Sequence, residues 1–431
     1  MNAVRIGIVG YGNVGRATAA IIEENSEDFA RRTGCPLKVT YISRRTPVLP
    51  QDLPAGVRYV GDWRQVVESA EVDIVVESMG GTETAREVVL NALERRKPVV
   101  TANKNLLAKY GNEIQALATR HRVPFGMEAA VAGGIPVVRA ITDGMTGDRL
   151  KAVYGILNGT TNYILTQMEN LGLGFGEALS QAQHKGYAEA DPAADIDGID
   201  ARDKLCILSR LAFHGWVSES EIATSGIRNI TASDFYYARQ LESTIRLVGH
   251  AELSGSGLEV SVAPWLVSRK SMLANVEGVN NAVFLIGERI GKQMFYGPGA
   301  GPDATGTAVV ADIVEIARGI HNKALQQRRL AGFDNVKPLR ITETARPLPW
   351  YLRLTVRDHP AILARVAQIM AEAEINIDAV LQMPNMPKES LSFVITVEPV
   401  LKGRVSKAVE RINKLDFMLT PVLLLRMEAA S

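Results

Sequence analysis

Short β-branched runs alternate with helix-compatible segments over the first third of the chain. The runs predict strands at residues 4–9, 37–42, 74–77 and 98–101. The segments between them predict helices at residues 16–24, 84–95 and 112–120. Strands that alternate with helices in this way form a parallel sheet covered on both faces, so we expect a doubly wound α/β domain at residues 1–145.

The pattern changes after residue 145, where strands and helices no longer alternate. Strands are predicted at residues 151–157, 258–266 and 282–290, and helices at 160–170 and 307–327. Residues 186–200 hold too many Asp and Gly for regular structure. We expect an α+β domain with a mixed sheet at residues 146–330, with the helix from 307 packing back on the first domain.

The final part of the chain begins with a linker and then restarts a regular pattern. Residues 331–349 carry three prolines and little periodicity. Beyond them, strands are predicted at 351–356, 377–382, 390–397 and 420–426, and helices at 361–372 and 402–415. This order predicts a ferredoxin-like βαββαβ domain at residues 350–431.

One helix in the middle region places charged residues on an apolar face. Lys204 follows Asp200 by one helical turn, and both share a face with Ile207, Leu208 and Leu211 at about 100° per residue. The polar residues Arg202 and Ser209 are predicted to point the opposite way, toward solvent. A lysine and an aspartate that face a core need partners, and such residues often carry out chemistry.

Composition and charge exclude several classes of function. The 431 residues are 46% hydrophobic and 22% charged, with a formal net charge of +1, so we expect neither nucleic acid nor a membrane surface as a partner. Apolar runs are too short to span a bilayer, and a strand begins too early for a signal peptide. The two cysteines favour a reducing compartment, so we expect a cytoplasmic protein.

A glycine pattern stands between the first strand and the first helix. Gly10, Gly12 and Gly15 form G-x-G-x-x-G in the context that a dinucleotide site requires. The first glycine permits a tight turn, the second lets the backbone approach the pyrophosphate, and the third lets the helix pack closely. The helix N-terminus attracts the phosphates, so this context favours a Rossmann-type dinucleotide site over a structural turn.

The end of the second strand bears on the choice of cofactor. An NAD-preferring site would place an acidic residue there for the ribose hydroxyl, but the chain has Ser43, Arg44 and Arg45. These residues suit a 2′-phosphate, so NADP is favoured and NAD remains possible. The alternative is that the arginines are solvated loop residues.

Further polar residues lie where ligands bind in open sheets. Lys104 follows a strand end and could polarise a substrate or relay a proton, although a surface charge is an equal alternative. Asn158–Asn162 opens a helix and could bind a ligand through its backbone, although a capped helix start alone explains this segment better. Five acidic residues follow: Glu189, Asp191, Asp195, Asp197 and Asp200. Their spacing does not match a calcium loop, and they suit a cationic amine better.

Six segments together resemble one family. They are GYGNVG at 10–15, TANKN at 101–105, EAAVAGGIP at 128–136, GILNGTTNYIL at 155–165, GYAEADPAADIDGIDARDK at 186–204 and GPGAG at 297–301. With these segments in order and a βαββαβ tail, the chain resembles homoserine dehydrogenase in its long form with a C-terminal ACT domain. The resemblance implies reversible NAD(P)-dependent interconversion of L-aspartate 4-semialdehyde and L-homoserine, in the biosynthesis of threonine, methionine and isoleucine.

The resemblance also assigns roles to residues. Lys204 would be the main proton donor or acceptor with Lys104 at the same oxygen, Asp200 would orient Lys204 and the substrate, and Glu189 would bind the substrate ammonium. Other substrate residues would be Asp195, Gly159 and Thr160. The cofactor would contact Gly10, Gly12, Asn13, Val14, Gly15, Ser43, Arg44, Arg45, Ser78, Lys104, Gly299 and Gly301. A monovalent cation, usually sodium, would be held by Glu128, Val131, Gly133 and Ile135.

Two segments depart from the family pattern. Residues 302–307 read PDATGT where the family usually has Pro-Thr-Ala, which alters the start of a helix near the cofactor. ACT domains usually have Pro-Gly at the first strand-to-helix turn, whereas this chain has Pro360-Ala361. Alanine can block an approach that glycine permits, so L-threonine as an effector is one of two even expectations. The resemblance implies a homodimer or higher homo-oligomer formed through the mixed sheet.

Two other functions compete with this reading. One is a dehydrogenase of another amino-acid aldehyde, because acidic residues indicate an amino group without fixing the substrate's length. The other is a catalytically inactive regulator that senses nucleotides and amino acids. Both lysines, Lys104 and Lys204, are present, and a sensor would need neither.

Overall fold

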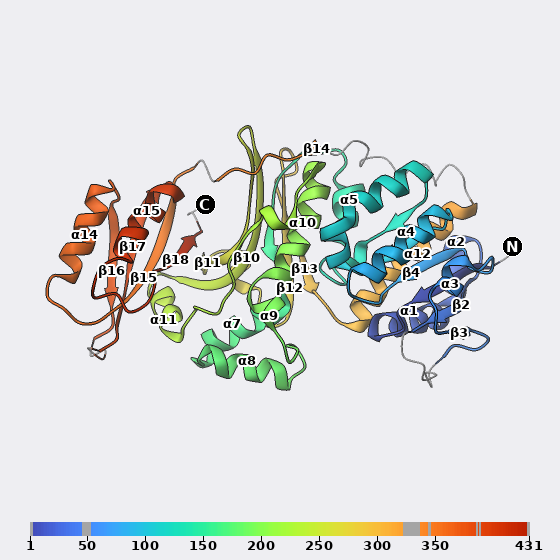
Figure 1. Ribbon diagram of the computed structural model, residues 1–431, viewed down its shortest axis with the longest axis horizontal. Coiled ribbons are helices and arrows are strands. Elements are labelled where there is room, and N and C mark those ends of the chain that lie inside the picture. Colours follow the sequence, from blue (N-terminus) through green and yellow to red (C-terminus); the bar gives the residue numbers. More distant parts are fainter. Residues whose placement is uncertain are drawn as a thin grey trace. The chain divides into compact units, whose positions relative to one another are not determined.

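The computed structural model describes residues 3–44, 53–321, 337–343, 346–384, 387 and 389–428. The chain divides into two compact units, each of which is described by itself. The first unit is drawn from Met1–Leu157, Arg202–Ile222 and Asn281–Leu339, and the second from Asn158–Ala201, Ala223–Asn280 and Arg340–Ser431. Figure 1 gives the labels of the elements.

The first unit contains a parallel six-stranded sheet in the order β3-β2-β1-β4-β5-β6. Its strands are β1 Val4–Val9, β2 Leu37–Ser43, β3 Arg58–Val60, β4 Ile74–Glu77, β5 Val99–Thr101 and β6 Phe125–Gly126. The order reverses between β1 and β4, and ligands of doubly wound sheets bind at such a point, beyond the carboxyl ends of the strands. The predicted doubly wound sheet is confirmed.

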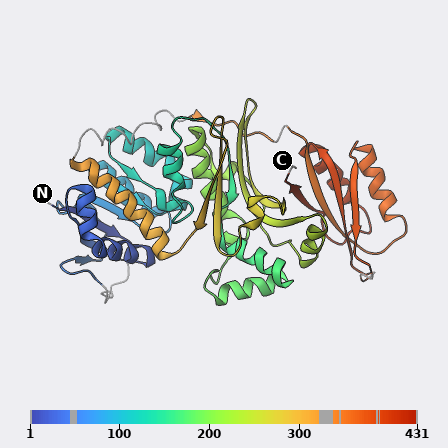
Figure 2. The ribbon, with the colours of Figure 1, turned by 180° about the vertical axis from the view of Figure 1, so that it is seen from behind.

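Helices cover this sheet. They are α1 Asn13–Glu24, α2 Ser26–Thr33, α3 Arg64–Glu68, α4 Glu83–Glu94, α5 Lys104–His121 and α12 Pro302–His321. Helix α12 shares one hydrophobic core with α1 and β1, and it lies beside α1 in Figure 2. It begins at Pro302 rather than at residue 307, because proline is favoured in a first helical turn. The predicted end at residue 327 lies outside the described residues.

The first unit also holds strands that follow a different pattern. Strands β7 Leu150–Ile156 and β12 Asn280–Gly287 pair antiparallel, and β13 Lys292–Pro298 lies beside β12. The predicted strand 282–290 therefore ends early and turns into β13, which the sequence pattern did not indicate. The remaining elements are η1 Glu128–Ala130, α6 Val137–Arg139, η2 Ala140–Gly144, β8 Gly215–Trp216, η3 Glu219–Glu221 and β14 Lys337–Pro338. Helix α10 Ile199–Phe213 has its first turn in the second unit and the rest in the first.

The second unit is built on a long antiparallel hairpin. Strands β10 Ser243–Ser254 and β11 Gly257–Ser268 pair along their whole lengths. Around them lie α7 Gly159–Leu171, α8 Phe175–His184, α9 Ala193–Ile196, β9 Ala223–Thr224, α11 Ala232–Gln240 and η4 Met272–Asn275. The short helix α9 falls in the stretch 186–200, so the expectation of no regular structure there was wrong for these residues.

The predicted βαββαβ arrangement is confirmed in the same unit. Its elements are β15 Leu348–Val356, α14 Ile362–Glu372, β16 Ile377–Gln382, β17 Leu391–Val400, α15 Lys402–Ile412 and β18 Leu423–Met427. The strand order is β18-β15-β17-β16, and both helices share a core with β15 and β17. Strand β18 also pairs in parallel with β11, with Trp265 opposite Arg426 and Leu266 opposite Met427. The sheet of the tail is therefore continuous with the β10–β11 hairpin.

The structure describes only part of the predicted linker. Within 331–349, residues 331–336 and 344–345 lie outside the described residues, whereas Lys337–Pro338 forms β14 and pairs with β8.

Among the described helices, none has both the length and the apolar character needed to cross a membrane.

Candidate active site

The glycine-rich turn after β1 is held tightly against the turn after β4. Gly10 has φ +102, and a Cβ there would lie 2.6 Å from the backbone of Met79. A Cβ on Gly15 would strike the Gly10 carbonyl, whereas one on Gly12 would meet nothing. Gly10 and Gly15 are therefore required for packing. Gly12 instead borders open space at the N-terminus of α1, whose first two residues are Asn13 and Val14.

Glu77 organises the neighbouring strand ends, and sequence reasoning missed it. Its carboxylate accepts hydrogen bonds from the Met79 amide at 2.9 Å and from the Thr101 hydroxyl at 2.6 Å. Burial raises the pKa of Glu77. Ser78 donates its hydroxyl to the Gly10 carbonyl at 2.8 Å. Ser78 thus has a visible structural role in the glycine turn, besides the cofactor contact expected of it.

The residues expected to choose the cofactor lie at the end of β2. Ser43 is buried, and its carbonyl accepts the Gly10 amide at 3.0 Å. Arg44 is half-buried, and its amide donates to the Val60 carbonyl at 3.4 Å. Arg45 lies outside the described residues. Lys104, also half-buried, is the first residue of α5, which Asn103 caps by accepting the Leu106 amide at 3.1 Å.

Lys204 is buried, as predicted, with 7% of its surface exposed. Its Nζ donates to the Leu157 carbonyl at 2.7 Å, and Asn281 Nδ2 donates to the same oxygen at 2.9 Å. A Cβ on Gly299 would overlap the Asn281 side chain, which explains one glycine of GPGAG. Gly301, at φ +121, needs its glycine for backbone conformation. No sequence motif indicated Asn281.

The helix of Lys204 is buried on more than the predicted face. Ser209, expected to face solvent, is fully buried, and its hydroxyl donates to the Leu205 carbonyl at 2.7 Å. Arg202 bonds Asp203 at 2.8 Å and keeps 21% of its side chain exposed. The prediction for Ser209 was wrong because a small hydroxyl that bonds the preceding turn can be buried at little cost.

In the second unit, Asn158 brings two of the expected substrate residues together. Its Nδ2 donates to Asp195 Oδ1 at 2.7 Å and to Asp200 Oδ2 at 2.8 Å. Its Oδ1 accepts the Thr161 amide at 2.8 Å and so caps helix α7. Asp200 is only 6% exposed and lies one turn before Lys204 on α10. The structure thus joins Asp195 and Asp200 through one amide.

The other expected substrate residues lie around the start of α7. Thr160 donates its hydroxyl to the Tyr187 carbonyl at 2.7 Å. A Cβ on Gly159 would lie 2.5 Å from the Val279 carbonyl oxygen, so that position requires glycine. Glu189 is exposed, and its carbonyl accepts a hydrogen bond from Gln183 at 3.1 Å. The carboxylate of Glu189 therefore differs from those of Asp195 and Asp200 in facing solvent.

The segment expected to hold sodium forms a compact loop in the first unit. The Glu128 carboxylate accepts the Val138 and Arg139 amides, each at 2.9 Å. Burial, together with Asp312, raises its pKa to about 7. Val131 and Ile135 are buried, and Gly133, at φ +55, packs where a Cβ would strike Gly299. Within the described chain no cluster of His, Cys, Asp or Glu residues suits a metal ion, so any cation here would depend on backbone carbonyls.

The two departures from the family pattern have structural outcomes. Residues 302–307 form the first turns of α12, and Gly306 lets that helix approach α1, because a Cβ there would lie 3.0 Å from Ala17. Ala361 takes a left-handed conformation, with φ +68, directly before α14. The turn therefore keeps the backbone shape that glycine usually provides, and alanine carries the strain.

Family models and known relatives agree over the whole chain. Models described as "Homoserine dehydrogenase, NAD binding domain" and "Homoserine dehydrogenase" match residues 10–128 and 136–314. A model described as "AHAS small subunit-like ACT domain" matches residues 352–419. The homoserine dehydrogenase of Pseudomonas aeruginosa is 39% identical over 437 residues, which cover 99% of each chain. That of Neisseria gonorrhoeae is 37% identical over 435 residues, covering 100% of this chain and 99% of the relative.

Solved structures give the same result. A homoserine dehydrogenase from Thiobacillus denitrificans superposes with a TM-score of 0.92 at 38% identity, covering 99% of this chain and 98% of the other. A hyperthermophilic archaeal homoserine dehydrogenase in complex with NADPH has a TM-score of 0.62 at 30% identity. It covers 73% of this chain and 97% of its own.

Proposed function

The chain belongs to the homoserine dehydrogenase family, and we propose that Lys204 exchanges the proton of the reaction with the substrate oxygen. The observation that carries this proposal is the buried position of Lys204, whose Nζ is fixed on the Leu157 carbonyl one turn from Asp200. A lysine so placed can donate a proton to a developing alkoxide or take it back. Lys104 assists at the same oxygen, and Asp200 orients Lys204.

The cofactor is a nicotinamide dinucleotide, which supplies the hydride when L-aspartate 4-semialdehyde is reduced to L-homoserine. We propose that NADP is preferred over NAD, because β2 ends in Ser43 and Arg44 rather than in an acidic residue. The relative of known structure that binds NADPH supports this choice. The open space at Gly12 and the N-terminus of α1 fit a pyrophosphate.

The substrate's amino group distinguishes it from a simple aldehyde. Asp195 and Asp200 supply negative charge at the start of α7, and Glu189 approaches the ammonium from the exposed side. Gly159 and Thr160 bind the substrate through the helix N-terminus. A dehydrogenase of another amino-acid aldehyde would use the same groups, so substrate length is tested by turnover.

Sodium is proposed at the loop that contains Glu128, Val131, Gly133 and Ile135. The proposed ligands are backbone carbonyl oxygens of these residues, which suit a hard cation, because the Glu128 carboxylate already accepts the Val138 and Arg139 amides. The close packing of Gly133 on Gly299 means that a filled site would steady the GPGAG turn.

Domain division, cellular location, assembly and regulation are also proposed from the family resemblance. We propose a division into domains at residues 1–145, 146–330 and 350–431 with a linker at 331–349, and the family models that match residues 10–128, 136–314 and 352–419 support it. A cytoplasmic homodimer or higher homo-oligomer is proposed. L-Threonine is proposed as an effector at the ACT-like domain, since the turn at Ala361 keeps a glycine-like backbone.

The first test is oxidation of NADPH and NADH with L-aspartate 4-semialdehyde by the wild type, Lys204→Ala and Lys109→Ala. Loss of Lys204 should lower kcat by about a hundredfold or more. Lys109, half-exposed and paired with Glu83 on the surface, is the matched control and should leave kcat unchanged. A Lys204→Ala enzyme with wild-type turnover would contradict the proposed role, and the ratio of the two cofactors tests the preference for NADP.

Two measurements separate the remaining alternatives. If the wild type binds NADPH without turnover of any aldehyde, the chain would act as a sensor of nucleotides instead. Equilibrium binding of L-threonine to the full chain tests the effector. No binding up to millimolar concentration would remove threonine from the proposal.

A further inference from the structure

Asn158 uses all of its hydrogen-bonding groups within one cluster. Both amide hydrogens go to carboxylates, one on Asp195 and one on Asp200. Its Oδ1 accepts twice from Thr161, from the amide at 2.8 Å and from the hydroxyl at 2.9 Å. An asparagine side chain has two donor hydrogens and two acceptor positions, so none is left over.

This pattern allows only one orientation of the amide. If oxygen and nitrogen were exchanged, the amide oxygen would face two carboxylates and the amide nitrogen would face the Thr161 N–H. Both contacts would be repulsive. Asn158 is 4% exposed, so water cannot readily replace these bonds. The side chain therefore acts as a rigid bridge between the start of α7 and the start of α10.

The bridge is neutral, which matters for what it can do. An arginine in the same place would hold the two carboxylates and cancel part of their charge, whereas an amide holds them and leaves their charge unchanged. Asp200 is thereby fixed in one rotamer at the first turn of α10, and Lys204 follows on the next turn of that helix. A fixed carboxylate one turn away sets the electrostatic surroundings of the lysine.

We propose that Asn158 is a positioning residue, which fixes Asp200 beside Asp195 and so sets the pH range in which the enzyme is active. This inference rests on the proposed roles of Asp200 and Lys204. It assigns to the first Asn of the NGTTN segment a task that differs from helix capping alone.

The two tasks of Asn158 can be separated by substitution. Serine and aspartate are helix caps about as good as asparagine, so Asn158→Ser and Asn158→Asp both keep an oxygen for the Thr161 amide. Neither keeps the NH₂ group that reaches two carboxylates. Asn158→Ser removes the bridge without adding charge, and Asn158→Asp removes it and adds a third negative charge to the cluster.

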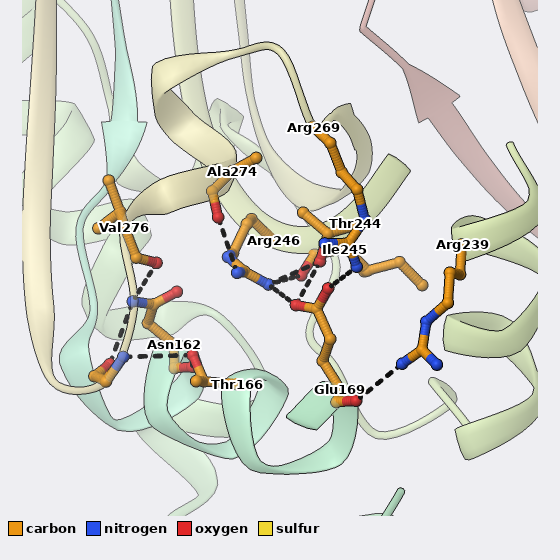
Figure 3. Close-up of polar contacts among 11 residues, drawn as sticks. Asn162, Thr166, Glu169, Arg239, Thr244, Ile245, Arg246, Arg269, Ala274 and Val276 are labelled. Carbon is orange, nitrogen blue, oxygen red and sulfur yellow. Dashed lines mark hydrogen bonds and ion pairs between the residues drawn. The ribbon is translucent and has the colours of Figure 1, made fainter. Parts of the chain in front are cut away.

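Asn162 is the matched control, because it lies one turn later on the same helix. Its Nδ2 donates to the carbonyls of Val276, Gly278 and Asn280 at 3.0 to 3.2 Å, and none of these acceptors is a carboxylate. Figure 3 shows the bond to Val276. Asn162→Ser should therefore lower the thermal stability and leave the shape of the pH profile unchanged.

The experiment measures homoserine oxidation with NADP by the full chain between pH 6 and 10, together with thermal unfolding. We expect Asn158→Ser to lower kcat about tenfold and to move the acid limb of the kcat profile upward by about one pH unit, because carboxylates that lose their neutral donors stabilise the protonated base more strongly. Asn158→Asp should move that limb further. Both variants should unfold within a few degrees of the wild type.

Two results would overturn the inference. One is a pH profile for Asn158→Ser that matches the wild type and Asn162→Ser. The other is unfolding of both Asn158 variants at the temperatures of Asn162→Ser or lower, which would make the residue structural. Lys204→Ala in the same assay keeps the proposals apart: if it stays active, the proposed function fails, whereas a normal Asn158→Ser beside an inactive Lys204→Ala removes only the inference.

Discussion

The two ends of helix α7 bury charge in opposite ways. At its start, one neutral amide, that of Asn158, holds two carboxylates. Near its end, one carboxylate, that of Glu169, is held by two arginines (Figure 3). Arg246 donates at 2.9 Å and Arg269 at 2.6 Å, and Thr244 adds a hydroxyl at 2.6 Å. The same helix thus carries an anionic cluster and a cluster in which cations outnumber the anion.

The difference indicates how charge is divided between stability and function. Glu169 and Arg246 are 7% and 1% exposed, and each would be costly to bury without the other. Their pairing anchors the helix and offers nothing to a ligand. The Asn158 bridge fixes geometry and leaves negative charge at the end of the helix where the substrate's ammonium is proposed to bind.

The largest expected effect comes from removing the Glu169 carboxylate, near the end of α7 where opposite charges are paired. Glu169→Gln leaves the buried Arg246 without its carboxylate, which should cost about 3–5 kcal/mol in the free energy of unfolding. Glu374→Gln, at the exposed pair with Arg404, should cost less than about 1 kcal/mol. Urea unfolding of both variants measures the difference. Equal losses would mean that the Glu169 cluster contributes no more than a surface pair.

A second buried cluster of paired charges should respond in the same direction, with a smaller loss in the free energy of unfolding. Asp234 accepts the Tyr351 hydroxyl at 2.8 Å and pairs with Arg353, where α11 packs on the tail sheet. Tyr351→Phe should cost about 1–2 kcal/mol, because a buried carboxylate loses one donor. Tyr236→Phe, at an exposed position of α11, should cost almost nothing. Denaturation midpoints that do not differ would contradict this assignment.

A buried histidine tests the same idea through pH. Burial lowers the pKa of His250, which lies among Glu252, Glu259 and Arg426, with Arg346 bonded to Glu252. The folded protein therefore holds this ring neutral, while the unfolded chain binds a proton below about pH 6.5. Its contribution to stability is present above that pH and is lost as pH falls, by at most about 1.4 kcal/mol per unit.

The variant His250→Gln should remove that part of the pH dependence. Thermal unfolding between pH 5 and 7.5 should give a flatter curve for it than for the wild type. His184→Gln, at an exposed histidine of α8, is the control and should keep the wild-type slope. Identical slopes for all three proteins would show that His250 does not titrate between the folded and unfolded states.

The smallest expected effect concerns strain rather than charge. Ala361 has φ +68, so Ala361→Gly should stabilise the protein by about 0.5 kcal/mol after the entropy of glycine is subtracted. Ala373, at φ −86 after the same helix, is the control, and Ala373→Gly should destabilise by a similar amount. Melting temperatures that move in the same direction would contradict the strain at Ala361.

The sequence predicted those elements whose apolar pattern is uninterrupted. Strands β1 and β4 have the predicted bounds, and so does β16 of the tail. Strand β10 was missed because Arg246 and His250 interrupt its pattern. Both are buried in it, and acidic partners reach them from other elements, Glu169 from α7 and Glu259 from β11. The alternation of polar and apolar residues therefore gave no signal.

The candidate site was predictable only in part, for a related reason. The apolar face of α10 indicated that Asp200 and Lys204 are buried, and both are. Asn281 and Glu77 could not be found in the same way, since each meets its partners through the fold. Asn281 reaches the Leu157 carbonyl across more than a hundred positions of the chain, and Glu77 bonds a threonine on the neighbouring strand. The role of Asn158 as a bridge likewise needs three segments at once.

The pairing of β18 with β11 has a consequence for synthesis of the protein. Trp265 and Leu266 of β11 pair with Arg426 and Met427, which leave the ribosome about 160 residues later. At usual rates of translation that interval is roughly 8–30 s. During this time a hydrophobic strand has an edge without its final partner, and such edges invite contacts between nascent chains. Strand β18 is the one that closes this edge, so translation that stops before β18 would yield a chain prone to aggregation rather than an enzyme lacking only its tail.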